Sequence, residues 1–326
     1  MKNNVMREHF LERFSSKSGL DFRLIPDLPA SLNIELNSTC NQKCVFCSYH
    51  SDHATHGLGA YVMDFKMATQ ILDEAWRLGI GRKEVGFYAC GEPFLYKNLA
   101  EVIAYAKKKG FPYTFLTTNG SVATPDRLKA VVDAGLDSIR FSVNACNPEQ
   151  YKAIHGRDDF NKVREHIKFL SEYRKESGSG IAISISCVIT RKTDGIQDSV
   201  YEQFHDLVDD IIFLPVLVIP DMRDQLADYM FERDKNAPVN EDFICKSVFD
   251  GMYIDAKGDV LVCCQGYGEE DAVAYHLGDG IDLEKAWESP VFQRYRKIFL
   301  ERKGLKGTIC EHCYLPLREN EGFFQE

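Results

Sequence analysis

The stretch LNIELNSTCNQKCVFC, residues 32–47, joins a short strand-like segment to three closely spaced cysteines. Apolar and polar residues alternate from Leu32 to Asn37, which predicts a β-strand. Cys40, Cys44 and Cys47 follow with the spacing C-x3-C-x2-C. Ligands of an iron–sulfur cluster or a zinc ion usually come in fours. The stretch therefore predicts a metal site with one position that these cysteines do not fill.

Strands and helices alternate beyond this stretch. The predicted strands are Leu32–Asn37, Glu84–Tyr88, Tyr113–Thr118, Ser138–Val143, Ile181–Ile189 and Ile211–Val216. The predicted helices are Lys66–Arg77, Leu99–Lys109, Pro125–Ala134, Phe160–Lys175 and Ser199–Leu207. Such βα units imply parallel strands with right-handed crossovers, and hence an α/β fold with a partial (β/α)6 barrel. Loops at the carboxyl ends of these strands build the active site, so the three thiols lie where chemistry is expected.

Strand alternation also predicts a polar barrel interior. On strand 138–143, Ile139 and Phe141 share the face that packs on the helices, while Arg140 and Ser142 face inward. The same alternation turns further polar residues inward: Asn33, Glu35, Asn37, Ser184 and Ser186. A polar interior suits a large polar ligand. Cys187 shares the apolar face of its strand and is expected to pack against helices.

Composition limits the classes of protein. The chain has 326 residues, 44% of them hydrophobic, with eleven cysteines and a formal net charge of −10. No signal peptide or long apolar span is visible, so we expect a cytoplasmic protein without a membrane partner. In that compartment the cysteines are expected to be metal ligands, catalytic thiols or buried residues. The negative charge argues against nucleic acid as a partner.

Four segments are expected along the chain: an N-terminal extension (1–29) with a helix at Met6–Phe14, the barrel (30–217), a bridging segment (218–242) and a small C-terminal unit (243–326). The C-terminal unit contains Cys245, a hairpin-like GMYIDAKGDVLVCC at residues 251–264 with a turn at Lys257-Gly258, and Cys310-Glu311-His312-Cys313. It shows few periodic elements, so we expect a metal to stabilise it.

Two further motifs accompany the cysteines of the barrel. Ala89-Cys90-Gly91-Glu92-Pro93 follows the second strand, and Thr117-Thr118-Asn119-Gly120 ends the third. Together with the C-x3-C-x2-C spacing, they resemble the radical S-adenosylmethionine (SAM) superfamily. The resemblance implies that Cys40, Cys44 and Cys47 hold a [4Fe-4S] cluster whose open iron binds SAM. It also implies cleavage of SAM to a 5′-deoxyadenosyl radical that takes a hydrogen atom from the substrate.

The same resemblance assigns the SAM-binding residues. Phe46 is expected beside the adenine, and Glu92, with Gly91, at the methionyl amino group. The remaining cofactor-binding residues that it implies are Thr118, Asn119, Ser142 and Asn144. Cys90 departs from the family pattern, in which glycine or threonine is usual.

Other interpretations of these residues remain open. The three cysteines could hold a structural zinc ion completed by a nearby histidine, namely His50, His53 or His56. Glu92 could be a solvated loop carboxylate. Ser142 and Asn144 could simply satisfy backbone groups.

A second group of cysteines lies near the C-terminus. Cys245, Cys263, Cys310 and Cys313 could supply four ligands to a second [4Fe-4S] cluster. Their order resembles the twitch domain, the shortened SPASM domain of radical SAM dehydrogenases of the 2-deoxy-scyllo-inosamine type. A zinc ribbon is the alternative for the same spacing.

The resemblance implies an oxidoreductase that takes a hydrogen atom from a carbinol of a small polar substrate, such as an amino sugar or aminocyclitol. The second cluster would accept the remaining electron, and an external donor such as flavodoxin or ferredoxin would reduce the first. Cys264 and Arg140 are the candidate catalytic residues. In one alternative Cys264 donates a hydrogen atom and the enzyme is an epimerase. In another the substrate is a peptide or protein, which the short N-terminal extension disfavours.

Overall fold

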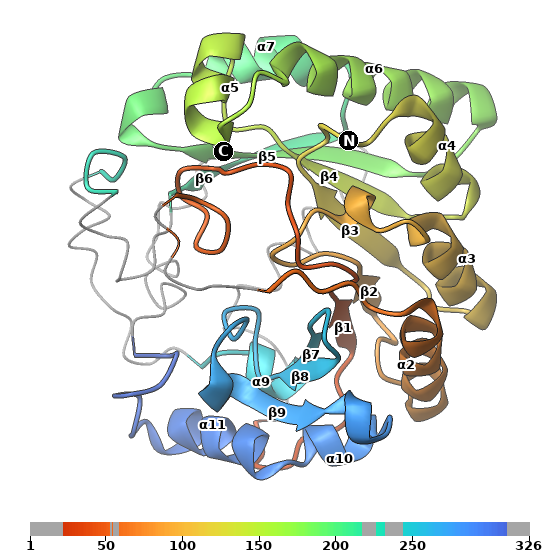
Figure 1. Cartoon of the computed structure of the whole chain (residues 1–326), viewed down its shortest axis with the longest axis vertical. Coiled ribbons are helices and arrows are strands. Elements are labelled where there is room, and N and C mark those ends of the chain that lie inside the picture. Colours follow the sequence, from red (N-terminus) through yellow and green to blue (C-terminus); the bar gives the residue numbers. More distant parts are fainter. Residues whose placement is uncertain (1–21, 53, 55–58, 217–225, 232–243, 312–326) are drawn as a thin grey trace.

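The computed structural model describes residues 22–52, 54, 59–216, 226–231 and 244–311. Their strands form a nine-stranded sheet in the order β6-β5-β4-β3-β2-β1-β7-β8-β9 (Figure 1). The strands are β1 (Ser31–Ile34), β2 (Glu84–Gly86), β3 (Thr114–Thr118), β4 (Ser138–Ser142), β5 (Ala182–Ile189), β6 (Asp210–Pro215), β7 (Gly251–Ile254), β8 (Asp259–Leu261) and β9 (Val273–His276). Each neighbouring pair from β1 to β6 is parallel, which confirms the predicted α/β architecture with a partial barrel.

Helices cover the outer side of this curved sheet, and the cysteine-bearing loop after β1 runs along its inner side (Figure 1). The helices of the barrel are α2 (Phe65–Leu78), α3 (Leu99–Lys109), α4 (Pro125–Asp133), α5 (Pro148–His155), α6 (Phe160–Ser177) and α7 (Gln197–Phe204). Those of the C-terminal unit are α9 (Ser247–Asp250), α10 (Leu283–Trp287) and α11 (Pro290–Glu301). None of the helices in the described ranges is long and apolar enough to span a membrane.

Helix α5 is an element that the sequence analysis did not predict. The Asn147 side chain caps it by accepting a hydrogen bond from Gln150 N at 2.9 Å, and Pro148 occupies its first turn. Gly156 ends it in the left-handed region at φ 71°. These signals are typical of helix ends. The helix spans only eight residues, too few to show a clear apolar period.

The C-terminal unit continues the barrel sheet. Strand β7 pairs in parallel with β1, with Leu32 opposite Met252, and β7 pairs antiparallel with β8. The predicted hairpin is thus confirmed. Its turn is closed by the Asp255 carboxylate, which accepts hydrogen bonds from Lys257 N and Asp259 N, both at 2.9 Å. The sheet therefore continues across the predicted boundary at residue 243 between the bridging segment and the C-terminal unit.

The expectation that this unit has few periodic elements was wrong. Ser289 caps α11 through Phe292 N, and the helix buries Phe292, Tyr295 and Arg296. The Arg296 guanidinium lies 4.1 Å from the Trp287 ring and donates to Val248 O at 2.8 Å. The buried apolar residues of α11, namely Phe292, Tyr295, Ile298 and Phe299, recur at helical spacing, so the sequence does carry a periodic signal for this helix.

The barrel interior is polar, as predicted. Arg140 lies opposite Ser184 across β4 and β5, and its Nε donates to Ser184 Oγ at 3.4 Å. On the other face Cys187 is buried in the core, as expected. Strand β1 ends at Ile34, so Glu35 and Asn37 lie just beyond it. The predicted helix Met6–Phe14, most of the segment 218–242, His312 and Cys313 lie outside the described residues.

Candidate functional site

The three cysteines of the loop after β1 lie half-buried and close together. Burial raises the pKa of Cys40 to about 11 and raises the pKa of Cys44 and Cys47 as well. Neighbouring thiols add to the rise for Cys40 and Cys44. Because the ligating species is the thiolate, a cation must compensate for this environment. The donor set fits an iron–sulfur cluster with three protein ligands.

The C-terminal end of α5 holds the cysteine loop. Lys43 N donates to His155 O at 3.3 Å, and Val45 N donates to Ile154 O at 2.9 Å. These carbonyls are among the last of the helix, which have no partner within it. Helix α5 thus fixes the backbone between Cys40 and Cys47, a role that nothing in the sequence pattern indicates.

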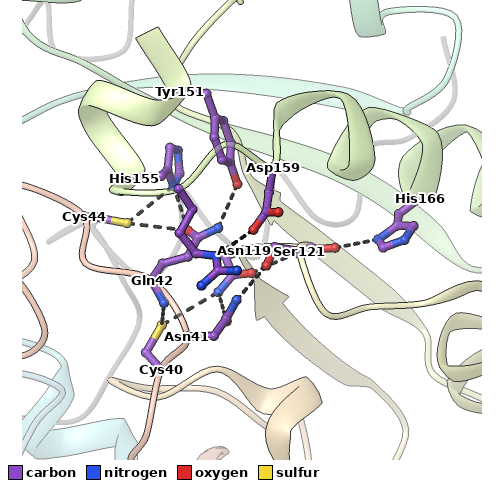
Figure 2. A network of polar contacts seen from close by, with 12 residues as sticks. Cys40, Asn41, Gln42, Cys44, Asn119, Ser121, Tyr151, His155, Asp159 and His166 are labelled. Atoms are coloured by element: carbon purple, nitrogen blue, oxygen red, sulfur yellow. Dashed lines mark hydrogen bonds and ion pairs between the residues drawn. The ribbon is translucent and has the colours of Figure 1, made fainter. Parts of the chain in front are cut away.

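One backbone N–H group and one side-chain amide donate to the sulfur of Cys40 (Figure 2). Its sulfur accepts from Gln42 N at 3.5 Å and from Asn119 Nδ2 at 3.7 Å. Asn119 Nδ2 also donates to Asn41 Oδ1 at 2.9 Å, and Asn41 Nδ2 donates to Ser121 Oγ at 2.6 Å. The segment that ends β3 is therefore hydrogen-bonded to the cysteine loop.

Glu92 lies buried beside this network, with 2% of its surface exposed. Its carboxylate accepts from Phe94 N at 3.0 Å, Asn119 N at 2.8 Å and Thr118 Oγ1 at 2.6 Å. Burial raises its pKa. The interpretation of Glu92 as a solvated loop carboxylate is therefore wrong. An ionised carboxylate has about four acceptor positions, so these three donors leave one for a further N–H group.

Gly91 lies where only glycine fits. A Cβ atom there would overlap the carbonyl oxygen of Asn37. Glu92 N donates to Thr39 O at 2.8 Å, and Asn37 Nδ2 donates to Glu92 O at 3.0 Å. These contacts join the loops after β1 and β2, and the absence of a side chain on Gly91 allows the two backbones to approach so closely.

The other predicted SAM-binding residues lie on the same inner side. Asn144 is 3% exposed, its Oδ1 accepts from Val188 N at 2.8 Å, and its Nδ2 lies 3.3 Å from His155 Nε2. Its amide thus contacts one backbone group and one side chain of the protein. Ser142 is half-buried on the same face as Arg140. Phe46 packs against a small buried cluster formed by Val216, Leu226 and Met230, which Val188 and Tyr229 also border.

Glu35 is a buried residue for which the sequence analysis predicted a position but no role. Its Oε1 accepts from Cys90 N at 3.0 Å and Gly91 N at 3.2 Å, and its Oε2 accepts from Ala256 N at 3.2 Å. Burial, with a smaller contribution from Asp255, raises its pKa to about 7. One carboxylate therefore connects the loop before Glu92 to the β7–β8 hairpin.

The C-terminal cysteines gather at the end of that hairpin. Burial raises the pKa of Cys263, and the thiols of Cys264, Cys310 and Cys245 raise it further. Three of the four predicted ligands are thus near one another, whereas Cys313 lies outside the described residues. Cys264 also contributes to the raised pKa of Cys90, where burial is the main cause. The Cys264 thiol is therefore within electrostatic reach of both the second cysteine group and the barrel loops.

The spacing of the thiols within each group bears on the kind of metal centre. In the described part of the chain, no three His, Cys, Asp or Glu side chains are arranged to hold a single metal ion. A [4Fe-4S] cluster spreads its ligands around four irons, so its cysteines lie farther apart than those of a zinc ion. Thiols that are near one another without enclosing one ion are compatible with such a cluster.

Comparison with protein families identifies the class of protein. The model of the radical SAM superfamily matches residues 34–194, and that of the SPASM iron–sulfur cluster-binding domain matches residues 245–314. The chain belongs to the radical SAM superfamily and carries a C-terminal SPASM-type domain. Its cofactors are accordingly SAM with a [4Fe-4S] cluster in the barrel, and iron–sulfur in the C-terminal unit. Both cysteine groups are therefore assigned to iron–sulfur clusters and not to zinc ions, the alternative that the sequence left open.

Curated relatives match only parts of the chain. A tungsten-containing aldehyde ferredoxin oxidoreductase cofactor-modifying protein of Pyrococcus furiosus is 27% identical over 232 residues, which cover 68% of this chain and 61% of that protein. A probable GTP 3′,8-cyclase of Methanococcus maripaludis is 28% identical over 138 residues, 42% of this chain and 44% of that protein. The matches thus span less than two thirds of either relative.

Solved structures share the fold at low sequence identity. SuiB of Streptococcus suis bound to SAM has a TM-score of 0.64 at 17% identity, covering 93% of this chain and 77% of SuiB. The complex of BtrN with AdoMet and 2-DOIA has a TM-score of 0.53 at 17% identity, covering 83% and 87%. For anSMEcpe with bound AdoMet the TM-score is 0.63 at 16% identity, covering 91% and 93%. At these identities the likeness shows the fold alone.

Proposed function

We propose that this radical SAM enzyme is an oxidoreductase that oxidises a carbinol of a small polar substrate, of the amino sugar or aminocyclitol type. The observation that carries the proposal is the position of the second cysteine group. The hairpin leading to Cys263 pairs with β1 and is bound through Glu35 to the loop before Glu92. A one-electron acceptor beside the SAM site is what oxidation of a substrate radical needs.

The cofactors define what the protein must position. When bound, SAM and its cluster supply a 5′-deoxyadenosyl radical, and the second cluster supplies a one-electron acceptor. Loss of the carbinol hydrogen atom leaves a substrate radical. Conversion of that radical to a carbonyl releases one proton and one electron, which balances the oxidation. Flavodoxin or ferredoxin is the proposed source of the electron that SAM cleavage consumes.

Specific residues take specific roles in this proposal. Cys40, Cys44 and Cys47 hold the first cluster, and the remaining acceptor position of Glu92 receives the methionyl ammonium of SAM. Gly91, Thr118 and Asn119 position Glu92, while Phe46, Ser142 and Asn144 surround the adenosine. The second cluster is held by Cys245, Cys263, Cys310 and Cys313. Arg140 faces the barrel interior, where it can bind hydroxyl or anionic groups of the substrate.

The structural relatives were crystallised with ligands of different sizes. BtrN was crystallised with 2-DOIA, SuiB with the precursor peptide SuiA, and anSMEcpe with the Cp18Cys peptide. The four-cysteine pattern of the C-terminal unit, which resembles the short twitch form, supports the small substrate. Formation of a modified peptide from a cysteine-containing precursor, with no turnover of aminocyclitols, would instead assign the chain to the peptide-modifying enzymes.

A second candidate reaction is epimerisation, favoured by the position of Cys264. This thiol is within electrostatic reach of Cys90 on the barrel side. A donor thiol would transfer its hydrogen atom to the substrate radical from the opposite face. The resulting thiyl radical would then need one electron and one proton to return to the thiol. The second cluster could supply that electron.

Reaction in deuterated water separates the two reactions. We expect anaerobic, dithionite-reduced enzyme to convert an aminocyclitol such as 2-deoxy-scyllo-inosamine to a carbonyl product without deuterium at the reacting carbon. We also expect Cys264→Ala to retain this activity. Cys187→Ala is the matched control, because Cys187 is fully buried in the core. Deuterium at the reacting carbon, lost in Cys264→Ala, would overturn the dehydrogenase proposal in favour of epimerisation.

A further inference from the structure

His155 is fully buried at the end of α5, beside the cysteine loop (Figure 2). Its ring stacks on Tyr151 with the centroids 4.0 Å apart and the planes 11° apart. The Tyr151 hydroxyl accepts a hydrogen bond from Gln42 Nε2 at 2.8 Å. Packing and hydrogen bonds therefore hold the imidazole in one orientation.

The tautomer of His155 follows from its partners. Nε2 lies 3.3 Å from Asn144 N, whose N–H group can only donate, so Nε2 is the acceptor. A neutral imidazole then carries its proton on Nδ1. Nδ1 lies 2.8 Å from Gln42 Oε1 and 3.4 Å from Cys44 Sγ. The Nδ1–H group is thus placed between an amide oxygen and the sulfur of a predicted cluster ligand.

The balance between these two acceptors depends on the state of Cys44. As a thiol, Cys44 can itself donate to Gln42 Oε1, from which its sulfur is 3.7 Å away. As an iron ligand, Cys44 has no proton and its sulfur can only accept. The anionic sulfur is then the stronger acceptor for the Nδ1–H group.

Hydrogen bonds to cluster sulfurs raise the reduction potential, because they stabilise the more negative reduced state. We propose that His155 is a positioning residue that donates its Nδ1–H to the Cys44 sulfur and so raises the potential of the SAM-binding cluster. Through Nε2 the same ring holds Asn144, so it also fixes a residue assigned to the adenosine site. The proposal rests on the assignment of Cys44 as a cluster ligand.

Two matched substitutions separate the donor from the rest of the ring. His155→Asn keeps an N–H group near the position of Nδ1, whereas His155→Gln places its amide near the position of Nε2. The measurement is a potentiometric titration of the anaerobic holoenzyme, followed by the EPR signal of the SAM-binding cluster. We expect a more negative midpoint potential in His155→Gln than in wild type, and a potential closer to wild type in His155→Asn. Equal potentials in all three proteins, or equal shifts in both variants, would overturn the proposal.

A measurement on the unaltered side chain covers the case in which the variants lose the cluster. Holoenzyme labelled with [15N]histidine should show a 15N coupling in the electron spin-echo modulation of the reduced SAM-binding cluster. The coupling should persist in His50→Asn, which removes the described histidine nearest in sequence to Cys47. Absence of the coupling would overturn the proposal. An iron content left unchanged by replacement of Cys40, Cys44 and Cys47 would instead show that the ligand assignment itself has failed.

Discussion

The two cysteine groups are brought together in different ways. Cys40, Cys44 and Cys47 lie in one loop, which the end of α5 holds through backbone hydrogen bonds. Cys245, Cys263 and Cys310 come from segments before α9, after β8 and after α11. The first group is therefore set by local sequence, whereas the second forms only when distant segments have packed. We therefore expect binding of the second cluster and folding of the C-terminal unit to stabilise each other.

The Glu35 carboxylate nevertheless joins the two regions. Glu35 accepts hydrogen bonds from the loop before Glu92 and from the β7–β8 hairpin. The apolar core is also continuous, since it includes Leu32 of β1, Ile254 of β7 and Trp287 of α10. The regions differ in how they form but are one packed unit, which the following predictions test.

The largest expected effect is that substitutions in the two cysteine groups abolish different steps, SAM cleavage in the first case and substrate oxidation alone in the second. Replacing Cys40, Cys44 and Cys47 together by alanine should abolish formation of 5′-deoxyadenosine from SAM. Cys263→Ala should retain 5′-deoxyadenosine formation but lose substrate oxidation, because only the second cluster is affected. Chromatographic assay of 5′-deoxyadenosine and product under dithionite measures both. Loss of SAM cleavage in Cys263→Ala with the first cluster intact would show that the two regions do not divide the chemistry.

Glu35→Gln should change how stability depends on pH. Burial raises the Glu35 pKa from 4.5 to about 7 in the folded protein, so the folded state binds this proton more tightly than the unfolded chain. The wild-type free energy of unfolding therefore falls as the pH rises through this window. The free energy of unfolding of Glu35→Gln, relative to that of wild type, should rise by on the order of 3 kcal/mol between pH 4.5 and pH 7. Urea unfolding at pH 5 and pH 8 measures this difference, and a difference that does not vary with pH would contradict the prediction.

Glu92→Ala should weaken SAM binding while both clusters remain. Loss of one hydrogen bond to a charged group costs about 1.5–3 kcal/mol, roughly 10- to 150-fold in Kd. Equilibrium binding of SAM to the anaerobic enzyme measures it. Glu101→Ala is the control, because this carboxylate is exposed on α3. Loss of a cluster without a binding defect would mean that Glu92 is structural.

Gly91→Ala should produce the smallest effect, confined to the contact between the loops after β1 and β2. The added methyl group overlaps the Asn37 carbonyl oxygen, and such overpacking costs about 1–3 kcal/mol of unfolding free energy. Gly180→Ala is the control, because a methyl group there would have no heavy atom within 4 Å; its effect should stay within about 0.5 kcal/mol. Equal unfolding free energies for the two variants would refute the close contact.

Much of the fold was predictable because it follows local patterns. The six parallel strands, the hairpin after Cys245 and the gathering of three C-terminal thiols agree with the sequence analysis. The approach of Thr118 and Asn119 to Glu92 likewise follows from their place at the carboxyl end of β3. Parallel strands bring such ends together whatever their side chains are.

What the sequence did not reveal depends on contacts with the backbone. Glu35 takes its three hydrogen bonds from N–H groups, which every residue but proline carries, so no motif identifies its partners. His155 likewise meets the cysteine loop only because α5 ends there. Helix α5 gives little periodic signal because it is short, whereas the buried residues of α11 do recur at helical spacing that the sequence analysis did not use.

Iron content tests the central claim most directly, because the two cysteine groups are assigned to two separate clusters. Anaerobically purified protein should be brown and contain about eight irons per chain, two clusters of four. The variant lacking Cys40, Cys44 and Cys47 should contain about four, all in the second cluster. Stoichiometric zinc with negligible iron, or an iron content that the substitution leaves unchanged, would contradict the account.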